Sequence, residues 1–334
     1  MRAWVVHQNG PPRAMRLEEL PEPPPRPELV RIAVAAAAVN FFDSLMVAGT
    51  YQVRPELPFI PGSEVAGVVV AAPSGSGFQA GQRVMARVAQ SGLSGGGYTQ
   101  LTDARPEEVV ALPAGMPFDE AASFFVNYQT GWFGLHRRAH LRPHEVLLVH
   151  AGAGGVGSAA IQLGKAAGAR VIATAGSAEK LEVCRSLGAD LAINYRDQDF
   201  VELVKADTEG RGADVVYDPV GGEVLVASTR CLAFEGRLIC VGFTSGDIPQ
   251  LRANHLLLKN YSVMGLYWGL YPGRLPELVT ECTAELLRLY GEGDLKPYIS
   301  RRLPLEGAAD ALEAVISRQT TGKVVLLPED HLRD

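Results

Sequence analysis

The chain has 334 residues, of which 47% are hydrophobic, 20% charged and 7% aromatic. This composition is typical of globular proteins and excludes a disordered or fibrous chain. Lys and Arg total 31 against 37 Asp and Glu, so the net charge of −6 leaves no broad basic field for a phosphate backbone or an anionic lipid surface. The length predicts two domains, and neither nucleic acid nor a membrane is expected as the main partner.

Cysteine usage and the N-terminal segment predict the compartment. The four cysteines form no Cys-x-x-Cys pair, which argues against a disulfide framework and a thiolate zinc cluster. Residues 1–10 alternate like a strand and lack the basic and apolar regions of a signal peptide, and no run of about 18 apolar residues occurs. We therefore expect a cytoplasmic protein without a membrane span.

The first 124 residues show the pattern of a mainly β domain. Short apolar or alternating segments are separated by Pro and Gly, which is typical of antiparallel strands joined by turns. The expected strands cover residues 2–7, 29–38, 64–71, 81–89 and 98–102, with a proline-rich turn at 21–27. Their arrangement predicts an antiparallel, barrel-like domain.

From about residue 123 the pattern changes to apolar strands that alternate with helices. Strands spaced by helices of roughly 10–15 residues predict βαβ units and a parallel sheet. The expected strands are 145–150, 171–174, 191–193, 215–217, 237–241 and 262–266, with helices at 155–167 and 178–187. After residue 270 we expect helices at 274–291 and 306–317 and a closing strand at 323–327.

A glycine-rich turn is the clearest functional signal. The segment Ala-Gly-Ala-Gly-Gly-Val-Gly of residues 151–157 follows an apolar strand and opens an alanine-rich helix. Gly152, Gly154, Gly155 and Gly157 allow backbone N–H groups and the helix N-terminus to approach a pyrophosphate that a Cβ atom would obstruct. Strand, turn, helix and second strand follow at the expected spacing, so the segment predicts a dinucleotide site rather than a tight structural turn.

The end of the second strand predicts which dinucleotide is bound. An NAD site would carry an Asp or Glu there to accept hydrogen bonds from the ribose 2′-OH, about 20 residues after the turn. This chain has Ala-Thr-Ala-Gly-Ser at residues 173–177, so Gly176 and Ser177 leave room for a 2′-phosphate. Lys180 lies one turn into the next helix, where its ammonium can reach that phosphate, although a solvated surface lysine is the alternative interpretation. We expect NADPH as the cofactor.

Several separate segments together resemble the zinc-independent quinone oxidoreductase (zeta-crystallin-like) family of the medium-chain dehydrogenase/reductase superfamily. The resemblance covers essentially the whole chain. It is carried by Ala-Val-Asn-Phe-Phe-Asp at residues 38–43, Gly-Thr-Tyr-Gln-Val at 49–53, Phe-Ile-Pro-Gly-Ser-Glu-Val-Ala-Gly at 59–67, the glycine turn, Gly-Ala-Asp at 188–190, Ile-Asn-Tyr at 193–195, Ser-Arg at 317–318 and Gly-Lys at 322–323.

The resemblance implies an α/β fold in which a doubly wound Rossmann sheet is inserted into a GroES-like, mainly β substrate domain. The expected divisions are residues 1–124 for the first part of the substrate domain, 125–267 for the NADP-binding domain and 268–334 for the return to the substrate domain. It also implies a homodimer formed through the edge strand of the Rossmann sheet, which matches residues 262–266 here.

The family's cofactor contacts can be carried over residue by residue. Tyr195 is implied beside the adenosine phosphate, Gly265 to Tyr267 near the nicotinamide, and Arg318 as a contact to the 2′-phosphate. The alternative for Arg318 is a partner for the dipole at a helix C-terminus. The full expected set is Tyr128, Thr130, Ala153, Gly154, Gly155, Val156, Gly176, Ser177, Lys180, Tyr195, Val241, Gly242, Phe243, Thr244, Gly265, Leu266, Tyr267 and Arg318.

The ligand positions of the zinc-dependent relatives hold other residues in this chain. Aligned by motif, Asn40, Ser63 and Asn127 occupy these positions, and amide and hydroxyl oxygens are poor ligands for Zn²⁺. Residues 85–105 contain no Cys, so the structural zinc lobe has no counterpart either. We expect no metal site, and we interpret Glu64 mainly as a structural hydrogen-bonding residue.

Without a Lewis acid, the expected substrate is a small molecule that is already electron-poor. Quinones and conjugated carbonyls fit, because the oxygen that becomes negative needs only hydrogen-bond donors or a later proton from water. Asn40 can donate through its amide, and Tyr51 either donates its hydroxyl or forms a wall of the pocket. Quinone reduction is the leading function. Reduction of an enone, enal or enoyl thioester is the alternative, and an NADPH-binding structural or regulatory protein with little turnover is a third.

Overall fold

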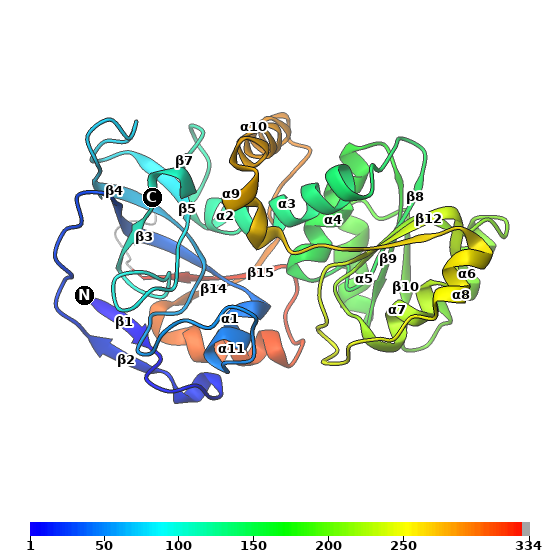
Figure 1. The fold of residues 1–334 in the computed structure, drawn as a ribbon, viewed down its shortest axis with the longest axis horizontal. Helices are drawn as coiled ribbons and strands as arrows, with labels where there is room; N and C mark the ends of the chain where they lie inside the picture. The colour runs from blue at the N-terminus through cyan, green and yellow to red at the C-terminus, as the bar shows by residue number, and fades with distance from the viewer. Residues whose placement is uncertain (329–334) are drawn as a thin grey trace. The chain divides into compact units, whose positions relative to one another are not determined.

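The computed structural model describes residues 1–328 and divides into two compact units (Figure 1). Of the described residues, unit 1 comprises Met1–Val126 together with 297–328, and unit 2 comprises Asn127–Lys296. Among residues 1–328, no helix has both the length and the apolar character needed to cross a bilayer.

Unit 1 is built around a mainly antiparallel sheet in the order β14-β15-β3-β4-β5-β7, with β6 also paired to β3 and a separate β1–β2 pair. The long strand β3 occupies the middle and pairs with the closing strand β15, with Val39 opposite Val324. The strands are β1 (Arg2–Val5), β2 (Arg16–Glu19), β3 (Val30–Val39), β4 (Glu64–Ala71), β5 (Arg83–Arg87), β6 (Leu101–Ala104), β7 (Val109–Ala111), β14 (Ile299–Pro304) and β15 (Lys323–Leu327).

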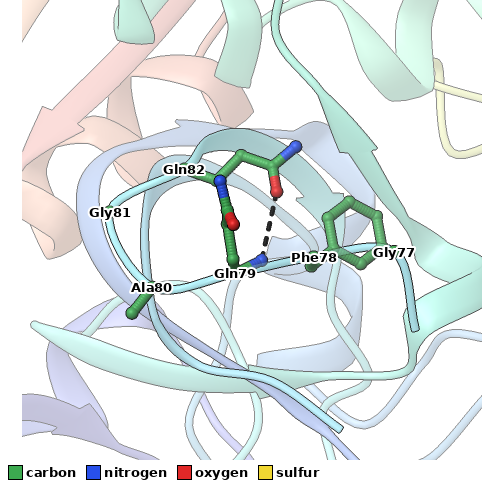
Figure 2. Close-up of a pocket in the computed structure, with 6 residues that line it drawn as sticks. All are labelled: Gly77, Phe78, Gln79, Ala80, Gly81 and Gln82. Atoms are coloured by element: carbon green, nitrogen blue, oxygen red, sulfur yellow. Dashed lines mark hydrogen bonds between the residues drawn. The ribbon is translucent and has the colours of Figure 1, made fainter. Parts of the chain in front are cut away.

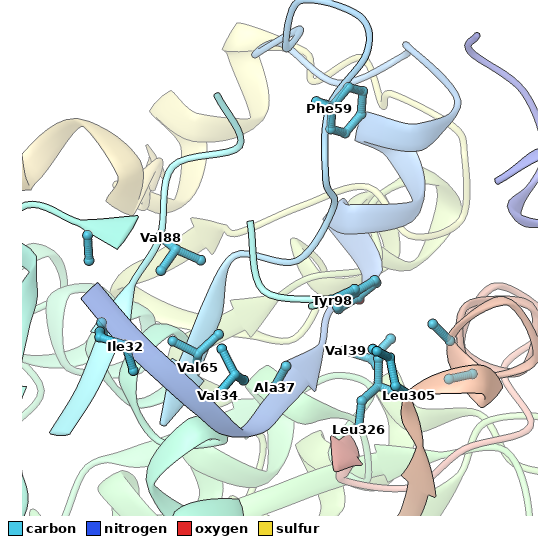
Figure 3. Packing of buried hydrophobic residues seen from close by; sticks show 14 of the residues in the cluster. Ile32, Val34, Ala37, Val39, Phe59, Val65, Val88, Tyr98, Leu305 and Leu326 are labelled. Atoms are coloured by element: carbon cyan, nitrogen blue, oxygen red, sulfur yellow. The ribbon is translucent and has the colours of Figure 1, made fainter. Parts of the chain in front are cut away.

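Most of β3 is buried because its sequence is almost continuously apolar, and its Val and Ala side chains pack into the core of unit 1. Figure 3 shows Val34, Val39 and Leu326 in this core together with the ring of Tyr98, which is fully buried. The helices of unit 1 are α1 (Phe41–Val47), α2 (Phe118–Ala122) and α11 (Ala308–Ile316), with short 3-10 turns η1 (Pro12–Ala14), η2 (Pro106–Glu108) and η5 (Leu305–Gly307).

Unit 2 contains a parallel sheet in the order β10-β9-β8-β11-β12-β13. The chain reverses its direction of winding between β8 and β11, which is where α/β folds of this kind bind ligands. The strands are β8 (Val146–Val149), β9 (Arg170–Ala175), β10 (Leu191–Asn194), β11 (Ala213–Asp218), β12 (Leu232–Cys240) and β13 (Ser262–Gly265). All four residues of β8 are buried, as expected for a central strand covered on both faces.

Helices flank this sheet, and side chains cap two of them. Ser177 caps α5 by accepting a hydrogen bond from the Lys180 N–H, and Asp199 caps α6 in the same way. The helical elements of unit 2 are α3 (Phe125–Trp132), the π-helix η3 (Phe133–Arg138), α4 (Gly155–Ala166), α5 (Ala178–Ser186), α6 (Phe200–Asp207), α7 (Gly222–Ser228), α8 (Ala253–Lys259), η4 (Trp268–Leu270), α9 (Tyr271–Arg274) and α10 (Pro276–Glu292). The two sheets confirm the expected fold class.

The second domain boundary differs from the expected one. The structure places the return to unit 1 at Pro297 instead of residue 268, and the first boundary falls between Val126 and Asn127. The reason is packing: α10 buries Cys282 and Leu286, and Gln129 Nε2 donates to Thr283 Oγ1 at 3.1 Å. The sequence beyond residue 268 is helical and amphipathic, and such a pattern fits either unit.

Candidate functional site

The glycine turn between β8 and α4 is too tight for side chains at two of its glycines. A Cβ atom on Gly157 would lie 2.2 Å from the Ala151 carbonyl oxygen, and one on Gly152 would lie 2.9 Å from Cys184 Sγ. Ala151 itself has a φ of 50°, so the backbone is held in a tight left-handed turn. Gly154 caps α4 without a side-chain hydrogen bond, which leaves the helix N-terminus open to an anion. The residues present therefore fit a dinucleotide.

Most of the predicted cofactor contacts lie at one edge of the unit 2 sheet. Because the strands are parallel, the residues that follow them gather where the carboxyl ends meet. Ala153 to Val156 follow β8, Gly176 and Ser177 follow β9, Tyr195 follows β10, Val241 to Thr244 follow β12, and Leu266 and Tyr267 follow β13, which ends at Gly265. The structure thus brings together residues that are separated by more than a hundred positions in the sequence.

The expected 2′-phosphate site contains a residue that the sequence analysis missed. A Cβ atom on Gly176 would lie 2.8 Å from the Tyr195 hydroxyl and 3.2 Å from Nε of Arg196, so both side chains lie over Gly176. Arg196 is exposed, and its guanidinium suits a phosphate better than an ammonium does. A basic residue directly after Tyr195 is the sequence signal that could indicate a phosphate contact here.

The loop after β12 is held against the loop after β11. Thr244 N–H donates to the Pro219 carbonyl at 3.0 Å, and the half-exposed Phe243 covers Gly221, where a Cβ atom would lie 2.6 Å from its ring. Asp218 ends β11 and accepts hydrogen bonds from the N–H groups of Val220 and Gly221. Burial raises the Asp218 pKa to about 6.

Three predicted cofactor contacts do not follow a strand of the unit 2 sheet. Tyr128 and Thr130 lie on α3 and are 2% and 9% exposed, so only a small part of each side chain is open to a ligand. Arg318 follows α11 in unit 1, with a left-handed φ of 57°. Cofactor contacts for all three stay predictions.

Unit 1 contains a buried charged network around Asn40. The Lys323 ammonium donates to Asn40 Oδ1 at 2.7 Å and to Glu64 Oε1 at 2.8 Å. Asn40 Nδ2 donates to the same Glu64 oxygen at 3.0 Å, and the other Glu64 oxygen accepts from the Val126 N–H at 2.8 Å. Lys323 and Glu64 are 3% and 0% exposed, so the pair is fully enclosed. Glu64 has the structural role expected for it, but its partner Lys323 was not foreseen.

A second network surrounds Asp43, on the first turn of α1. Its carboxylate accepts hydrogen bonds from Ser63 Oγ at 2.7 Å, Tyr98 OH at 3.0 Å, Asn40 N at 2.9 Å and Gln90 Nε2 at 3.3 Å. Burial raises the Asp43 pKa to about 6, and these donors oppose that rise. Asn40 and Ser63, which stand at two of the zinc-ligand positions of the relatives, thus hydrogen-bond to protein groups. Within residues 1–328, no cluster of three His, Cys, Asp or Glu side chains is placed to hold a metal ion.

Tyr51 lies in the loop after α1. Its ring stacks on Phe42 with centroids 5.6 Å apart and planes at 26°. The side chain is half-buried. The stacked ring suits a pocket wall, and the hydroxyl remains a candidate donor, so both interpretations stay open.

A surface hollow lies at the hairpin between β4 and β5 in unit 1. Figure 2 shows its lining, residues 77–82, where the Gln79 N–H donates to Gln82 Oε1 at 3.2 Å. None of the candidate site residues lies in this hairpin, so we assign the hollow no part in the chemistry.

Comparisons with known proteins agree with this architecture. Residues 26–114 match the family described as alcohol dehydrogenase GroES-like domain, and residues 155–284 match the family described as zinc-binding dehydrogenase. The chain is 38% identical over 300 residues to a quinone oxidoreductase-like protein 2 homolog of Nematostella vectensis, covering 89% of this chain and 81% of the relative.

Two comparisons with Escherichia coli proteins extend over nearly the whole chain. Quinone oxidoreductase 1 of strain K12 is 34% identical over 327 residues, covering 96% of this chain and 98% of the relative. The crystal structure of Escherichia coli quinone oxidoreductase complexed with NADPH superposes with a TM-score of 0.90 at 32% identity, covering 98% of this chain and all of that one. The chain therefore belongs to the zinc-independent quinone oxidoreductase family of the medium-chain dehydrogenase/reductase superfamily.

Proposed function

We propose that this protein is an NADPH-dependent oxidoreductase that reduces quinones without zinc. The observation that carries the proposal is the glycine turn of unit 2, where side chains at Gly152 and Gly157 would collide with neighbouring atoms of the protein. A tight glycine turn that opens a helix is typical of a pyrophosphate site. The relatives named quinone oxidoreductase, one of them solved with NADPH, support both the cofactor and the acceptor.

The cofactor would be held along the carboxyl edge of the unit 2 sheet. Ala153 to Val156 would bind the pyrophosphate, while Ser177, Lys180, Tyr195 and Arg196 would surround the 2′-phosphate. The loops after β12 and β13 would border the nicotinamide end, and Arg318 of unit 1 would add a further phosphate contact. When bound, NADPH supplies a hydride to an electron-poor acceptor.

The residues of unit 1 would then stabilise charge on the acceptor. Asn40 Nδ2 carries two hydrogens, one of which is donated to Glu64. The second would be donated to the acceptor oxygen as it becomes negative, which is the task that a Lewis acid performs in zinc enzymes. Tyr51 would contact the acceptor ring as a wall or through its hydroxyl. A quinone suits this arrangement because it needs only such donors and a proton from water.

The first prediction concerns substrate choice. We expect purified protein, pretreated with a strong chelator, to oxidise NADPH with a benzoquinone or naphthoquinone at a rate at least about tenfold above its rate with alkenals or enoyl thioesters, and to show no ethanol oxidation with NADP⁺. The assay is loss of NADPH absorbance with each acceptor in parallel. Faster turnover of an enoyl thioester would favour the alternative reductase, and NADPH binding without turnover of any acceptor would favour a structural or regulatory role.

We further propose a homodimer formed through β13. This strand is at the edge of its sheet, with one side unpaired by any strand within residues 1–328. Nearby in the sequence, α8 exposes Leu257 and Leu258 to 77% and 74%, and Ile248 is 72% exposed. Apolar side chains this exposed are typical of a surface that a partner covers. We propose that the same dimer contact covers these side chains.

The second prediction tests that surface. Light scattering after size exclusion should give a dimer for the wild type and a monomer for the Leu257→Lys/Leu258→Lys variant, because four buried ammonium groups per dimer are not tolerated. Val70→Lys, at an exposed apolar position on β4 of unit 1, serves as the control and should remain dimeric. A wild-type monomer at micromolar concentration would contradict the proposal.

A cytoplasmic location is also proposed. Its support is chemical: Cys184, Cys231, Cys240 and Cys282 are all free thiols, and burial raises the pKa of each. Cysteines that remain unpaired fit a reducing compartment.

A further inference from the structure

The Asn40 side chain has a different chemical partner at each end of its amide. Oδ1 accepts from the Lys323 ammonium at 2.7 Å, and Nδ2 donates to the Glu64 carboxylate at 3.0 Å. Asn40 is 5% exposed, so water competes little for either contact. Lys323 and Glu64 also contact each other at 2.8 Å, which closes a triangle of three side chains.

These partners allow only one orientation of the amide. An ammonium can only donate hydrogen bonds, and a carboxylate can only accept them. A 180° rotation of the Asn40 amide would place its NH₂ group against the Lys323 ammonium and its oxygen against Glu64. Both contacts would then be repulsive, and in a buried site such polar mismatches are costly. The pair therefore determines which end of Asn40 faces which neighbour.

We propose that Lys323, acting with Glu64, is a positioning residue that holds the Asn40 amide with its second N–H directed to the substrate. The inference rests on the proposed function, in which Asn40 donates to the developing oxyanion. Within residues 1–328, only one hydrogen-bond partner is found for Nδ2, the Glu64 carboxylate, so one N–H is available. A rotated amide would present its oxygen instead, and an oxygen lone pair repels the negative charge that forms during reduction.

The sheet register explains how such distant residues meet. Val324 of β15 pairs with Val39 of β3 in an antiparallel ladder, so Lys323 falls opposite Asn40, although 283 positions separate them. Glu64 begins β4, the other neighbour of β3. The end of the central strand thus receives one charged group from each flanking strand.

An ion pair of this kind has little value for stability alone. Replacing both members of a buried pair by neutral groups of similar size is often neutral or stabilising, whereas removing one member leaves a buried charge. The Lys323→Met/Glu64→Gln variant is therefore expected to fold. The oxygen of the glutamine introduced at position 64 can still accept from the Val126 N–H, which turns the glutamine NH₂ group towards Asn40. An NH₂ group only donates, so it favours the rotated Asn40 amide, with the Asn40 oxygen towards position 64.

The kinetic experiment compares this double variant with three others, using NADPH and a naphthoquinone. We expect the kcat of the double variant to fall about tenfold, while its NADPH Kd stays within about twofold of the wild-type value. Removal of an oxyanion donor lowers kcat by about 10²–10³, and a misoriented Asn40 amide loses only part of that contribution. Lys323→Arg retains a pure donor and should stay within about threefold of the wild-type kcat. Asn40→Ala measures the full contribution of the donor.

The control is a second buried ion pair of unit 1. Arg31 and Asp103 are 8% and 2% exposed and join at 2.9 Å, at the opposite end of β3 from Asn40. The Arg31→Met/Asp103→Asn variant also removes a buried pair, and its kcat should remain at the wild-type value. A loss in both double variants would indicate a general effect of unit 1 stability and would overturn the inference.

A second readout does not depend on activity. In ¹⁵N-labelled protein, the Asn40 side-chain NH₂ signals, identified by their absence in Asn40→Asp, should form one pair that shifts or doubles in Lys323→Met/Glu64→Gln. Unchanged Asn40 NH₂ signals together with wild-type kcat in Lys323→Met/Glu64→Gln would overturn the positioning role. The Asn40→Ala variant separately tests whether Asn40 donates to the substrate. If Asn40→Ala retains full kcat, the donor step of the proposed function fails and the inference fails with it. If the wild type reduces no quinone, the proposed function fails, and the NH₂ signals alone decide whether Lys323 and Glu64 orient the amide.

Discussion

Replacing Lys180 and Arg196 together by alanine is expected to weaken NADPH binding about 30- to 150-fold, while NADH binding changes by no more than about twofold. The reason is the position of both cations at the site where a 2′-phosphate is expected. Gly176 lies beneath the Tyr195 hydroxyl and the Arg196 guanidinium, and Lys180 follows in the first turn of α5. NADH has no phosphate there and loses no ionic contact.

The magnitude follows from exposed charge-assisted hydrogen bonds. Each contributes about 1.5–3 kcal/mol when sheltered, and exposure of Arg196 argues for the lower figure or less. Two contacts give roughly 2–3 kcal/mol, which is the stated range in affinity. The alanine variants remove both cations without adding an atom near Gly176. The more direct change Gly176→Asp with Lys180→Ala should also narrow the preference, but its new Cβ atom would lie 2.8 Å from the Tyr195 hydroxyl, so it adds a steric effect.

The measurement is a fluorescence titration of both cofactors at two salt concentrations. The NADPH preference of the wild type should decrease at high salt, because exposed ionic contacts are screened. Arg185→Ala is the matched control, since Arg185 is an exposed arginine of the same helix that pairs with Glu182. An unmodified protein that binds NADH as tightly as NADPH would show that this phosphate site is misassigned.

Local sequence patterns predicted the parts of the fold that depend on neighbouring residues. The glycine turn was found because a strand, a turn and a helix are adjacent in the chain, and β4 and β15 were predicted with the same bounds as observed. The turn needs glycine for a steric reason that acts over a short stretch of chain, between Ala151 and Gly157. Features of this kind can be predicted from a single short segment, because all the residues that determine them lie within it.

Long-range pairings escaped prediction for the opposite reason. Lys323 belongs to a motif that carries the family resemblance, but the motif assigns it no partner, and only the register of β15 against β3 brings it to Asn40. No strand is predicted at β14, because Arg301 and Arg302 make this edge strand polar. The apolar pattern predicts β12 only from residue 237, whereas the structure begins it at Leu232 and includes Glu235 with a φ of 57°. Arg196 is likewise not recognisable as a candidate phosphate contact from its own segment, because only the fold brings it close to Gly176.

A large effect is also expected on acid stability, through His150, which directly precedes the glycine turn. We expect the free energy of unfolding to fall by about 3 kcal/mol more in the wild type than in His150→Gln between pH 7 and about pH 4.5. His150 is 1% exposed, and the ring of Phe200 meets it edge-on with centroids 4.9 Å apart. Burial lowers the His150 pKa from 6.5 to about 3.

The hydrogen bonds around the ring show that it is held neutral. Ser228 Oγ donates to the Val224 carbonyl at 2.7 Å, so it accepts from His150 Nε2–H at 2.8 Å. Nδ1 is then the unprotonated nitrogen and accepts from the Thr174 hydroxyl at 2.9 Å. A second proton would enter at Nδ1 and displace the Thr174 donor. Thr174 also accepts the Gly152 N–H through its carbonyl, so the disturbance begins beside the glycine turn.

The sign of the effect follows from proton uptake. Between pH 6.5 and 3 the unfolded chain binds a proton on His150 that the folded protein does not, so stability is present above this window and is lost as the pH falls through it. A pH of 4.5 lies about two pH units below the His150 pKa of 6.5 in the unfolded chain. This difference corresponds to about 3 kcal/mol at about 1.36 kcal/mol per pH unit. Asp43 and Asp218 have pKa values raised to about 6, so their contributions run the other way, but the wild type and the variant share them.

Urea unfolding at both pH values, on wild type, His150→Gln and His255→Gln, measures this difference. The glutamine introduced in place of His150 can donate to Ser228 and accept from Thr174, so the variant keeps the neutral hydrogen bonds but cannot take up a proton. His255 is exposed on α8, and its variant controls for the removal of one histidine without loss of a buried contact. Equal acid losses in the wild type and His150→Gln would mean that the imidazole gains access to water below pH 6.5 before the protein unfolds. The acid sensitivity would then arise elsewhere, and the neutral ring beneath the glycine turn would not limit the pH range in which the cofactor site is intact.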